Sequence, residues 1–306
     1  MTSARHPLPT DIVALVSFDG DIYPNEAKPL ERLGAQGDVR PLENALEQWF
    51  SFATGKHTWV SVRGATIRGL ISARKRAKRS AWEVEVMINT TDDASIAETL
   101  FVQMLGGIGR QGAERVFLRL EADNPLKQAA RKAGFFSYAD ETLFRRPALQ
   151  PPSQVDLPLR KKTKADTLGL FQLYNREVPA NVRAVEGMTL KEWQASQEAW
   201  GGKHSDYVIE QDGVIEGWLR VMTGDVSRIT ALGTGSYDDL ISAGLQLLGE
   251  REAFCLAPDY APGLAAAFER HDFEPVGAYT SLAKRLTQRV GELAPETAND
   301  AIPVGQ

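Results

Sequence analysis

Two carboxylates on one predicted strand are the first residues in the chain that could do chemistry. Glu83 and Glu85 alternate with apolar residues over 81–89, so both carboxylates lie on one face of the predicted strand. A carboxylate beside a cleft can take a proton from a substrate. Charged side chains on a solvated strand are also common without any catalytic role, and both interpretations stay open.

Nucleophilic and metal chemistry find less support in the sequence. Cys255 is the single cysteine, which excludes an intrachain disulfide and a multi-cysteine zinc site, and its place in a predicted buried strand favours an inert thiol. The four histidines fall into no metal-binding or catalytic-triad spacing: they are His6, His57, His204 and His271. We therefore expect no metal cofactor.

Two short motifs invite a nucleotide or nucleic-acid interpretation. The segment 107–112, GIGRQG, matches the dinucleotide-binding fingerprint, but a predicted helix precedes it and a predicted strand follows, which reverses the required order. We interpret it as a helix-to-strand connection. The basic run 74–79, RKRAKR, could contact phosphate or RNA, but a solvated turn between strands is the interpretation that we favour.

Composition is that of an ordinary globular protein, with 43% apolar and 25% charged residues among 306. The net charge of −5 argues against general affinity for nucleic acid or anionic membranes. No apolar run approaches the roughly 20 residues that a membrane span needs, and the first nine residues lack the apolar core of a signal peptide. We expect a cytoplasmic protein without nucleic-acid or membrane partners.

The elements that would position these residues occur twice. A strand–helix–strand pattern over 114–146 returns about 138 residues later at 252–286, and a hairpin over 59–71 matches 207–219 without a gap at an offset of 148. The sequence therefore predicts two copies of one α/β domain. The predicted ranges are an N-terminal domain at 1–150, a proline-rich linker at 151–158, a C-terminal domain at 159–290 and a disordered tail at 291–306.

Each copy also carries a strand that runs directly into a helix. In the first copy the strand 81–89 precedes a helix over 94–106, after an earlier amphipathic helix within 39–52. In the second, the strand 226–232 precedes a helix over 237–248, with a Thr189 cap opening another helix upstream.

This order of elements resembles the GNAT N-acetyltransferase superfamily. The likeness spans about 8–146 and 157–286. It is carried by the Ile67-x-Gly69 hairpin, the Trp82–Asn89 strand followed by a helix, Gly112–Arg115 leading into a strand, and Asn124 followed by Lys132–Phe135. The resemblance implies two domains, each with a mixed central sheet flanked by helices. It also implies that two parallel strands splay apart and that acyl-coenzyme A enters the gap.

The resemblance further implies particular site residues. The pantetheine of acetyl-CoA or another acyl-CoA co-substrate would pair with the backbone of Met87, Ile88 and Asn89, and Asn124 would lie at the splay. Glu83 and Glu85 would be the candidates for the base that takes the ammonium proton. On these grounds we expect the first copy to hold acyl-CoA.

Both copies depart from the family pattern. The glycine-containing pyrophosphate loop is missing from the first copy, where Asp92 and Asp93 place carboxylates at the start of the helix and should repel phosphate. The second copy has two glycines in 233–236 but again carries two aspartates in the first helical turn. The tyrosine that protonates the departing thiolate in many members is replaced by Ala130 and Phe268.

Two function classes follow. One is an acyl-CoA-dependent N-acyltransferase with at most one active domain, acting on a small-molecule or protein amine. The other is a non-catalytic tandem pair that serves as a binding or scaffold protein after losing coenzyme A chemistry. The resemblance favours the enzyme, and the altered pyrophosphate loops favour the binding protein.

Overall fold

The computed structural model describes residues 3–11, 14, 26–34, 56–64, 66–78, 80–89, 93–152, 157–198, 203–224 and 226–286. Several predicted features lie outside these ranges: the helix within 39–52, Asp92, residues 153–156 of the linker and the tail 291–306. We call residues 3–152 the first half and 157–286 the second half.

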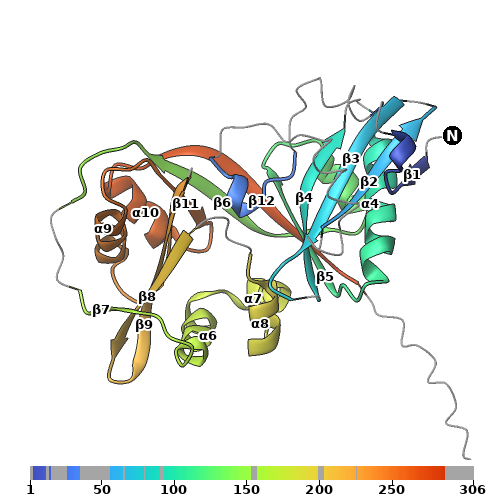
Figure 1. The fold of residues 1–306 in the computed structure, drawn as a ribbon. Helices are drawn as coiled ribbons and strands as arrows, with labels where there is room; N and C mark the ends of the chain where they lie inside the picture. The colour runs from blue at the N-terminus through green and yellow to red at the C-terminus, as the bar shows by residue number, and fades with distance from the viewer. Residues whose placement is uncertain are drawn as a thin grey trace, which may run out of the picture.

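Within the described residues the strands form one mixed sheet in the order β1-β2-β3-β4-β5-β12-β6-β11-β10-β9-β8-β7 (Figure 1). The strands of the first half are β1 (Ser3–Arg5), β2 (Lys56–Arg63), β3 (Thr66–Lys75), β4 (Ala81–Asn89), β5 (Arg115–Glu121) and β6 (Phe136–Arg146). Those of the second half are β7 (Leu159–Lys161), β8 (Lys203–Gln211), β9 (Val214–Thr223), β10 (Ser227–Gly233), β11 (Ala253–Pro258) and β12 (Glu274–Arg285).

The last strand of each half pairs with a strand of the other half. β12 pairs antiparallel with β5, with Leu282 opposite Leu118, and β6 pairs antiparallel with β11, with Phe144 opposite Cys255. The two exchanged strands also pair with each other, and they run as long ribbons through the middle of the molecule (Figure 1). The chain passes from the first half to the second at 147–158. Strand pairing, in contrast, continues from one half to the other without a break.

The two predicted hairpins have the same geometry. β2–β3 and β8–β9 are antiparallel pairs, and each carries one register shift, between Ser61 and Val62 in the first and between Ile209 and Glu210 in the second. These positions are 148 apart, the offset of the sequence match. The prediction of equivalent hairpins is confirmed.

The described helices are α4 (Ala94–Gly109), α5 (Leu126–Lys132), α6 (Thr167–Glu177), α7 (Ala180–Glu186), α8 (Leu190–Ser196), α9 (Tyr237–Leu248) and α10 (Pro262–Arg270), with 3-10 turns η1 (Pro9–Asp11) and η2 (Leu30–Arg32). They include two whose ranges were predicted, and α7 was not predicted. α9 begins and ends as predicted, and Thr189 opens α8 with a capping box. α4 extends to Gly109, three residues beyond its predicted end, so the fingerprint-like segment is a helix end followed by a turn; as predicted, it leads from a helix to a strand. None of the described helices is long and apolar enough to cross a membrane.

Each half has its own core, and two helices pack between the halves. In the first core α4 places Leu100, Phe101 and Met104 against the sheet, and in the second α9 and α10 place Ile241 and Phe268 there. α7 and α8 belong to the second half, yet they pack on β4, β5 and β12. The cluster that joins them consists of Ala81, Phe117, Val185, Ala195 and Ala283. These helices therefore bridge the two halves (Figure 1).

Candidate functional site: two strand splays

Parallel strands separate at one place in each half. β4 and β5 pair only from Ala81 to Glu83, and β10 and β11 pair only from Ser227 to Ile229. Beyond these residues each strand lacks a neighbour on that side, and an extended ligand could pair with the free backbone. β3 of the first half and β9 of the second half are equivalent strands. Their pairing partners show that Asn89 of β4 corresponds to Gly233 of β10, and that Ile88 corresponds to Leu232.

The chain itself enters the first splay. The inserted segment, residues 26–34, donates a hydrogen bond from Glu26 N to Met87 O over 2.9 Å and one from Lys28 N to Arg119 O, also over 2.9 Å. Ala27 between them is completely buried. The segment thus bonds to both strands that separate, and it uses a backbone oxygen that the sequence assigned to pantetheine.

Glu26 engages two further predicted cofactor-binding residues. Its carboxylate accepts hydrogen bonds from the backbone of Asn89 and the side chain of Asn124, and burial nevertheless raises the pKa of Glu26 above its usual value. The Asn124 oxygen accepts from Leu126 N at 2.9 Å. The structure therefore brings Met87, Asn89 and Asn124 together at the splay, around the chain's own glutamate.

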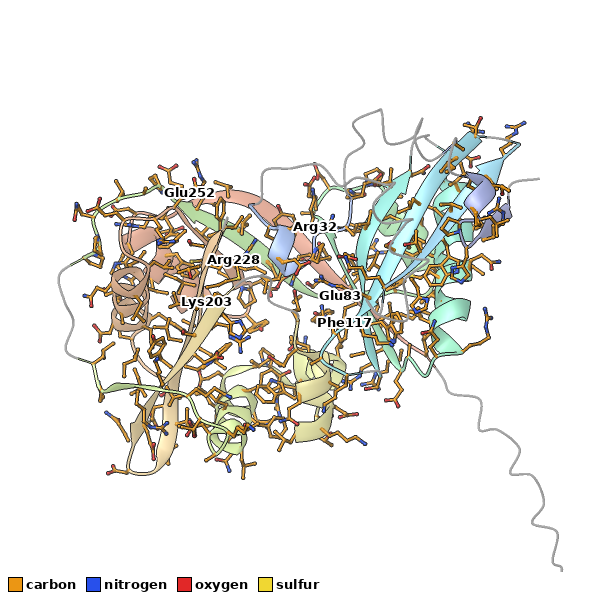
Figure 2. All side chains as sticks on the ribbon, in the orientation of Figure 1. Arg32, Glu83, Phe117, Lys203, Arg228 and Glu252 are labelled. Carbon is orange, nitrogen blue, oxygen red and sulfur yellow. The ribbon has the colours of Figure 1, made fainter. Side chains whose placement is uncertain are left out.

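The inserted segment continues toward the second half. Arg228 of β10 donates to the carbonyl oxygens of Glu31, at 3.0 Å, and Leu33. In Figure 2, Arg32, Glu83 and Arg228 lie in the central region where the halves meet. Gly34, with φ of 76°, lies on the ring of Phe254, where an added Cβ would be 2.5 Å from a ring carbon. Residues of both the first half and the second half therefore contact the inserted segment.

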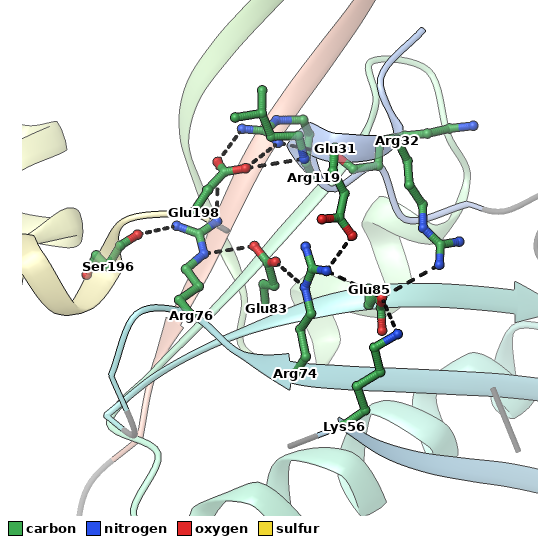
Figure 3. A network of polar contacts seen from close by, with 12 residues as sticks. Glu31, Arg32, Lys56, Arg74, Arg76, Glu83, Glu85, Arg119, Ser196 and Glu198 are labelled. Carbon is green, nitrogen blue, oxygen red and sulfur yellow. Dashed lines mark hydrogen bonds and ion pairs between the residues drawn. The ribbon is translucent and has the colours of Figure 1, made fainter. Parts of the chain in front are cut away.

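Glu83 and Glu85 are buried in an ion-pair network rather than facing an open cleft (Figure 3). Glu83 accepts from Arg74 Nε at 2.6 Å and from Arg76 Nε at 3.0 Å. Glu85 Oε1 lies 3.0 Å from Lys56 Nζ, 3.5 Å from Arg74 Nη1 and 3.6 Å from Arg32 Nη2. Each carboxylate thus has at least two cationic partners, an arrangement that stabilises its charge and holds it in place.

The network extends across the junction between the halves. Glu198, which follows α8, lies 3.4 Å from Arg76 and 2.7 Å from Arg119, and Arg119 also lies 2.7 Å from Glu141. The side chains of Arg74 and Arg76 are only 11% and 7% exposed, so the interpretation of this basic run as a solvated turn is wrong for these two residues. Partner carboxylates from β4 and from the second half draw them inward.

The α4 N-terminus is occupied by the chain's own carboxylate. Asp93 is the N-cap, and its Oδ1 accepts from Ser95 N at 3.0 Å and from Ser95 Oγ at 2.6 Å. A phosphate would compete with this carboxylate for the same donors and be repelled by its charge.

The second splay has a different backbone environment. Among the described residues, no backbone hydrogen bond joins 230–232 to a segment outside the sheet. The strand leads into a loop, 233–236, in which Thr234 N donates to Glu216 O at 3.0 Å and Ser236 caps α9. A Cβ added at Gly235 would meet nothing within 4 Å. The approach to the α9 N-terminus is open at this glycine.

The negative charge in the first helical turn of α9 is partly offset by a neighbouring arginine. Asp238 lies 2.7 Å from Arg270 Nη2 and 3.6 Å from His271 Nε2. The hydrogen bonds from Arg270 lower the pKa of Asp238 below its usual value. The arginine offsets the charge of Asp238, whereas the nearby Asp239 is exposed.

Aromatic side chains from α6 and α8 lie over the free end of β10. Phe171, Tyr174 and Trp193 have ring centroids 5.7–6.3 Å apart. The apolar cluster around Tyr174 also includes Leu232 of β10 and two further tyrosines, Tyr138 and Tyr260. This side of the second splay is thus largely aromatic.

One carboxylate adjoins this aromatic cluster. Tyr174 donates its hydroxyl hydrogen to Glu186 at 3.0 Å, and burial raises the pKa of Glu186 to about 7. Arg115 of the first half donates to the Glu186 backbone oxygen at 2.7 Å. Tyr174 therefore holds the carboxylate, and Arg115 of the first half holds the backbone at the end of α7.

Sequence analysis did not find Glu186, Tyr174 or Tyr260. A weak sign was present, because Glu186 is the last residue of α7 and a carboxylate at a helix C-terminus is unfavourable with the helix dipole. Only the placement of α7 against the sheet reveals its burial. Among the described residues, no group of three or more His, Cys, Asp or Glu could hold a metal ion.

Known structures of similar shape identify the fold. A GCN5-related N-acetyltransferase from Sphaerobacter thermophilus matches 93% of this chain and 95% of its own at 14% identity, with a TM-score of 0.57. A tandem GNAT protein from the clavulanic acid biosynthesis pathway matches 93% of this chain and 98% of its own at 10% identity, with a TM-score of 0.50. The chain has the GNAT fold, as the resemblance implied.

A candidate acetyltransferase from Pyrococcus horikoshii has the same fold, with 13% identity and a TM-score of 0.52 over 94% of this chain and 90% of that one. No protein-family model and no curated protein sequence match the chain.

Proposed function

We propose that the protein is an acyl-CoA-dependent N-acyltransferase that transfers an acetyl or other acyl group to an amine, and that acyl-CoA binds in the second half. The supporting observation is the contrast between the splays. In the first, Met87 O is bonded to Glu26 N, whereas in the second no described segment bonds to the free end of β10. The GNAT fold of the neighbours supports acyl transfer in general.

The second half offers what the two ends of acyl-CoA require. Pantetheine is an extended chain with two amides, which suits an unpaired strand edge such as 230–232. Pyrophosphate suits the N-terminus of α9, where the helix dipole favours an anion by about 0.3–1 kcal/mol. Gly235 leaves the approach open, and Arg270 offsets the charge of Asp238.

This proposal departs from the sequence-based prediction that the first copy holds acyl-CoA. Asn89 and Asn124 hold Glu26, and Asp93 caps α4. These contacts favour a non-catalytic role for the first half only. In that role the first half would support the second half structurally. We also propose that the halves are copies of one GNAT domain, which the shared register shift supports, and that the protein acts in the cytoplasm.

Calorimetric titration of the full chain with acetyl-CoA and with free coenzyme A tests the proposal. We expect one site per chain. Gly235→Val should weaken binding about tenfold or more, equivalent to about 1.4 kcal/mol, because its side chain fills the approach to α9. Gly224→Val is the matched control, since Gly224 also has open space at its Cβ and no positive φ.

Asn124→Ala should leave the affinity unchanged. Absence of binding to the parent would refute the proposal. Binding that survives Gly235→Val but is lost with Asn124→Ala in a folded protein would return the site to the first half.

A further inference from the structure

We infer that Glu186 is the base that takes the proton from the acceptor's ammonium group, and that the acceptor enters over the second splay beside α6, α7 and α8. This inference rests on the proposed function. It assigns the base to a helix residue instead of the predicted strand carboxylates Glu83 and Glu85, each of which is held by at least two cations.

The position of Glu186 relative to β10 supports the assignment. Leu232 lies at the free end of β10, where acyl-CoA would pair, and it packs in the cluster that contains Tyr174. Tyr174 in turn donates to the Glu186 carboxylate at 3.0 Å. Tyr174 thus connects the Glu186 carboxylate to the apolar cluster that includes Leu232 of β10.

The surroundings of Glu186 leave its carboxylate available to a cation. Among the described residues, no Lys, Arg or His nitrogen lies within 4.0 Å of it. The charged or titratable groups that face it are Arg76 from the β3–β4 connection, Glu141 and Tyr138 from β6, Tyr174 from α6, Glu198 after α8 and Tyr260 after β11. Glu141 and Glu198 pair with Arg119, and Arg76 pairs with Glu83 and Glu198. These charges offset one another, whereas the Glu186 carboxylate has no cationic partner among the described residues.

The acid–base properties of Glu186 fit the step. Burial is the largest influence on its pKa and raises it to about 7, while Arg76 and the Tyr174 hydrogen bond oppose the increase. A base whose pKa lies near the working pH is about half ionised and still strong enough to accept a proton.

The reaction balances with acyl-CoA as the only co-reactant. The ammonium group gives one proton to Glu186, and the freed nitrogen lone pair attacks the thioester carbonyl carbon. The C–N bond forms and the C–S bond breaks, and coenzyme A leaves with the sulfur electron pair. A second nitrogen proton reaches the thiolate, the third stays on the amide, and Glu186 returns its proton to water.

The aromatic side chains indicate the class of acceptor. Phe171, Trp193 and Tyr260 are only partly buried and belong to the cluster around Tyr174. Aromatic faces attract cations and pack against apolar groups. We therefore expect a primary amine on an apolar or aromatic stem, for which benzylamine, tyramine and cadaverine are suitable probes.

The test compares acetyl-CoA binding with acetyl transfer in Glu186→Gln. We expect the acetyl-CoA affinity to stay within about threefold of the parent, because the substitution lies on the acceptor side. Release of coenzyme A in the presence of the amine probes should fall by about a hundredfold or more. The acid limb of the parent's pH–rate profile, near pH 7, should disappear. Glu192→Gln in the α8 capping box is the matched control and should retain the parent's rate.

Tyr174→Phe provides a second, independent variant that leaves the carboxylate in place. The Tyr174 hydrogen bond lowers the pKa of Glu186, so its removal should move the acid limb to higher pH. A Glu186→Gln protein that transfers acetyl within threefold of the parent rate, with the acid limb unchanged, would overturn the inference.

Parent protein that binds acetyl-CoA but acetylates none of the three amines would also overturn the inference while leaving acyl-CoA binding intact. Failure of the parent to bind acetyl-CoA would instead refute the proposed function.

Discussion

Replacing Glu83 by Gln separates a structural role of this carboxylate from a catalytic one. Glu83 is 3% exposed and accepts from both Arg74, at 2.6 Å, and Arg76, at 3.0 Å. Glutamine has nearly the same size, but it is neutral and presents one acceptor oxygen. The substitution therefore leaves two buried guanidinium groups with less compensation.

The expected loss of stability is large. Removing one partner from a buried ion pair costs about 3–5 kcal/mol. The remaining partners, Glu31 and Glu85 for Arg74 and Glu198 for Arg76, are within 4.0 Å and should limit the loss to about 3 kcal/mol. With an unfolding entropy of roughly 2.1 cal/mol/K per residue, this corresponds to a Tm lower by about 5 °C for a chain of 306 residues.

Thermal unfolding followed by circular dichroism measures this effect. Glu210→Gln is the control, since Glu210 forms an exposed ion pair with Arg160 and should cost about 1 kcal/mol or less. Acetyl transfer by Glu83→Gln, assayed well below its Tm, should match the parent. A Tm within 1 °C of the parent, together with a hundredfold loss of transfer, would show that Glu83 is the base and that our structural account of it is wrong.

Three further predictions concern stability and reactivity. Folding raises the pKa of Glu186 from 4.5 to about 7, so the free energy of unfolding falls as pH rises through this window, by about 3 kcal/mol when complete. Glu186→Gln should therefore raise the Tm at pH 8 and not at pH 4.5. An equal gain in Tm at both pH values would contradict this. Gly34→Ala should lower stability by about 2 kcal/mol in thermal unfolding, since φ is 76° and the methyl group would collide with Phe254; an unchanged Tm would disprove that contact. Burial raises the pKa of the Cys255 thiol, so alkylation should proceed only at the rate of unfolding, and rapid reaction of the native protein would count against its burial.

Local sequence patterns predicted the elements that are stabilised locally. The hairpin match at an offset of 148 contains the turn glycines and the alternation that set strand register, and the two register shifts coincide. α9 begins after Ser236 and ends before Gly249, both of which are readable cap residues. Such features depend on residues that are neighbours in the sequence.

The sequence pattern does not determine which of the two last strands pairs with which half. Both 142–146 and 281–285 consist of a hydroxyl residue, two apolar residues and two basic ones, so either strand could pair with β5 or with β11. The observed choice places Glu141 of β6 beside Arg119 of β5 and Ser281 of β12, and the contact with Ser281 exists only after the halves meet. Tertiary contacts settle such pairings.

The candidate site was missed for a related reason. Glu83 and Glu85 stand out in the sequence because strand alternation places them on one face, but alternation does not reveal which cations cover that face. The inserted segment 26–34 has no period, and its hydrogen bonds go to β4 and β5, more than 50 residues away. Glu186 has unusual acidity only because α7 is enclosed by elements from both halves.

The contacts of α7 and α8 explain how a first half without a coenzyme site could still be required. Arg115 donates to the backbone oxygen of Glu186, and Arg76 to that of Ser196, so two first-half arginines hold the helices beside the second splay. Phe117 packs with Val185 and Ala195 at the same junction. Since neither 7-residue helix would be stable alone, the position of the proposed base depends on this surface. Filling the first splay with residues 26–34 makes that surface rigid, because Glu198 accepts from both Leu30 N and Arg119 and so joins the inserted segment, β5 and the end of α8.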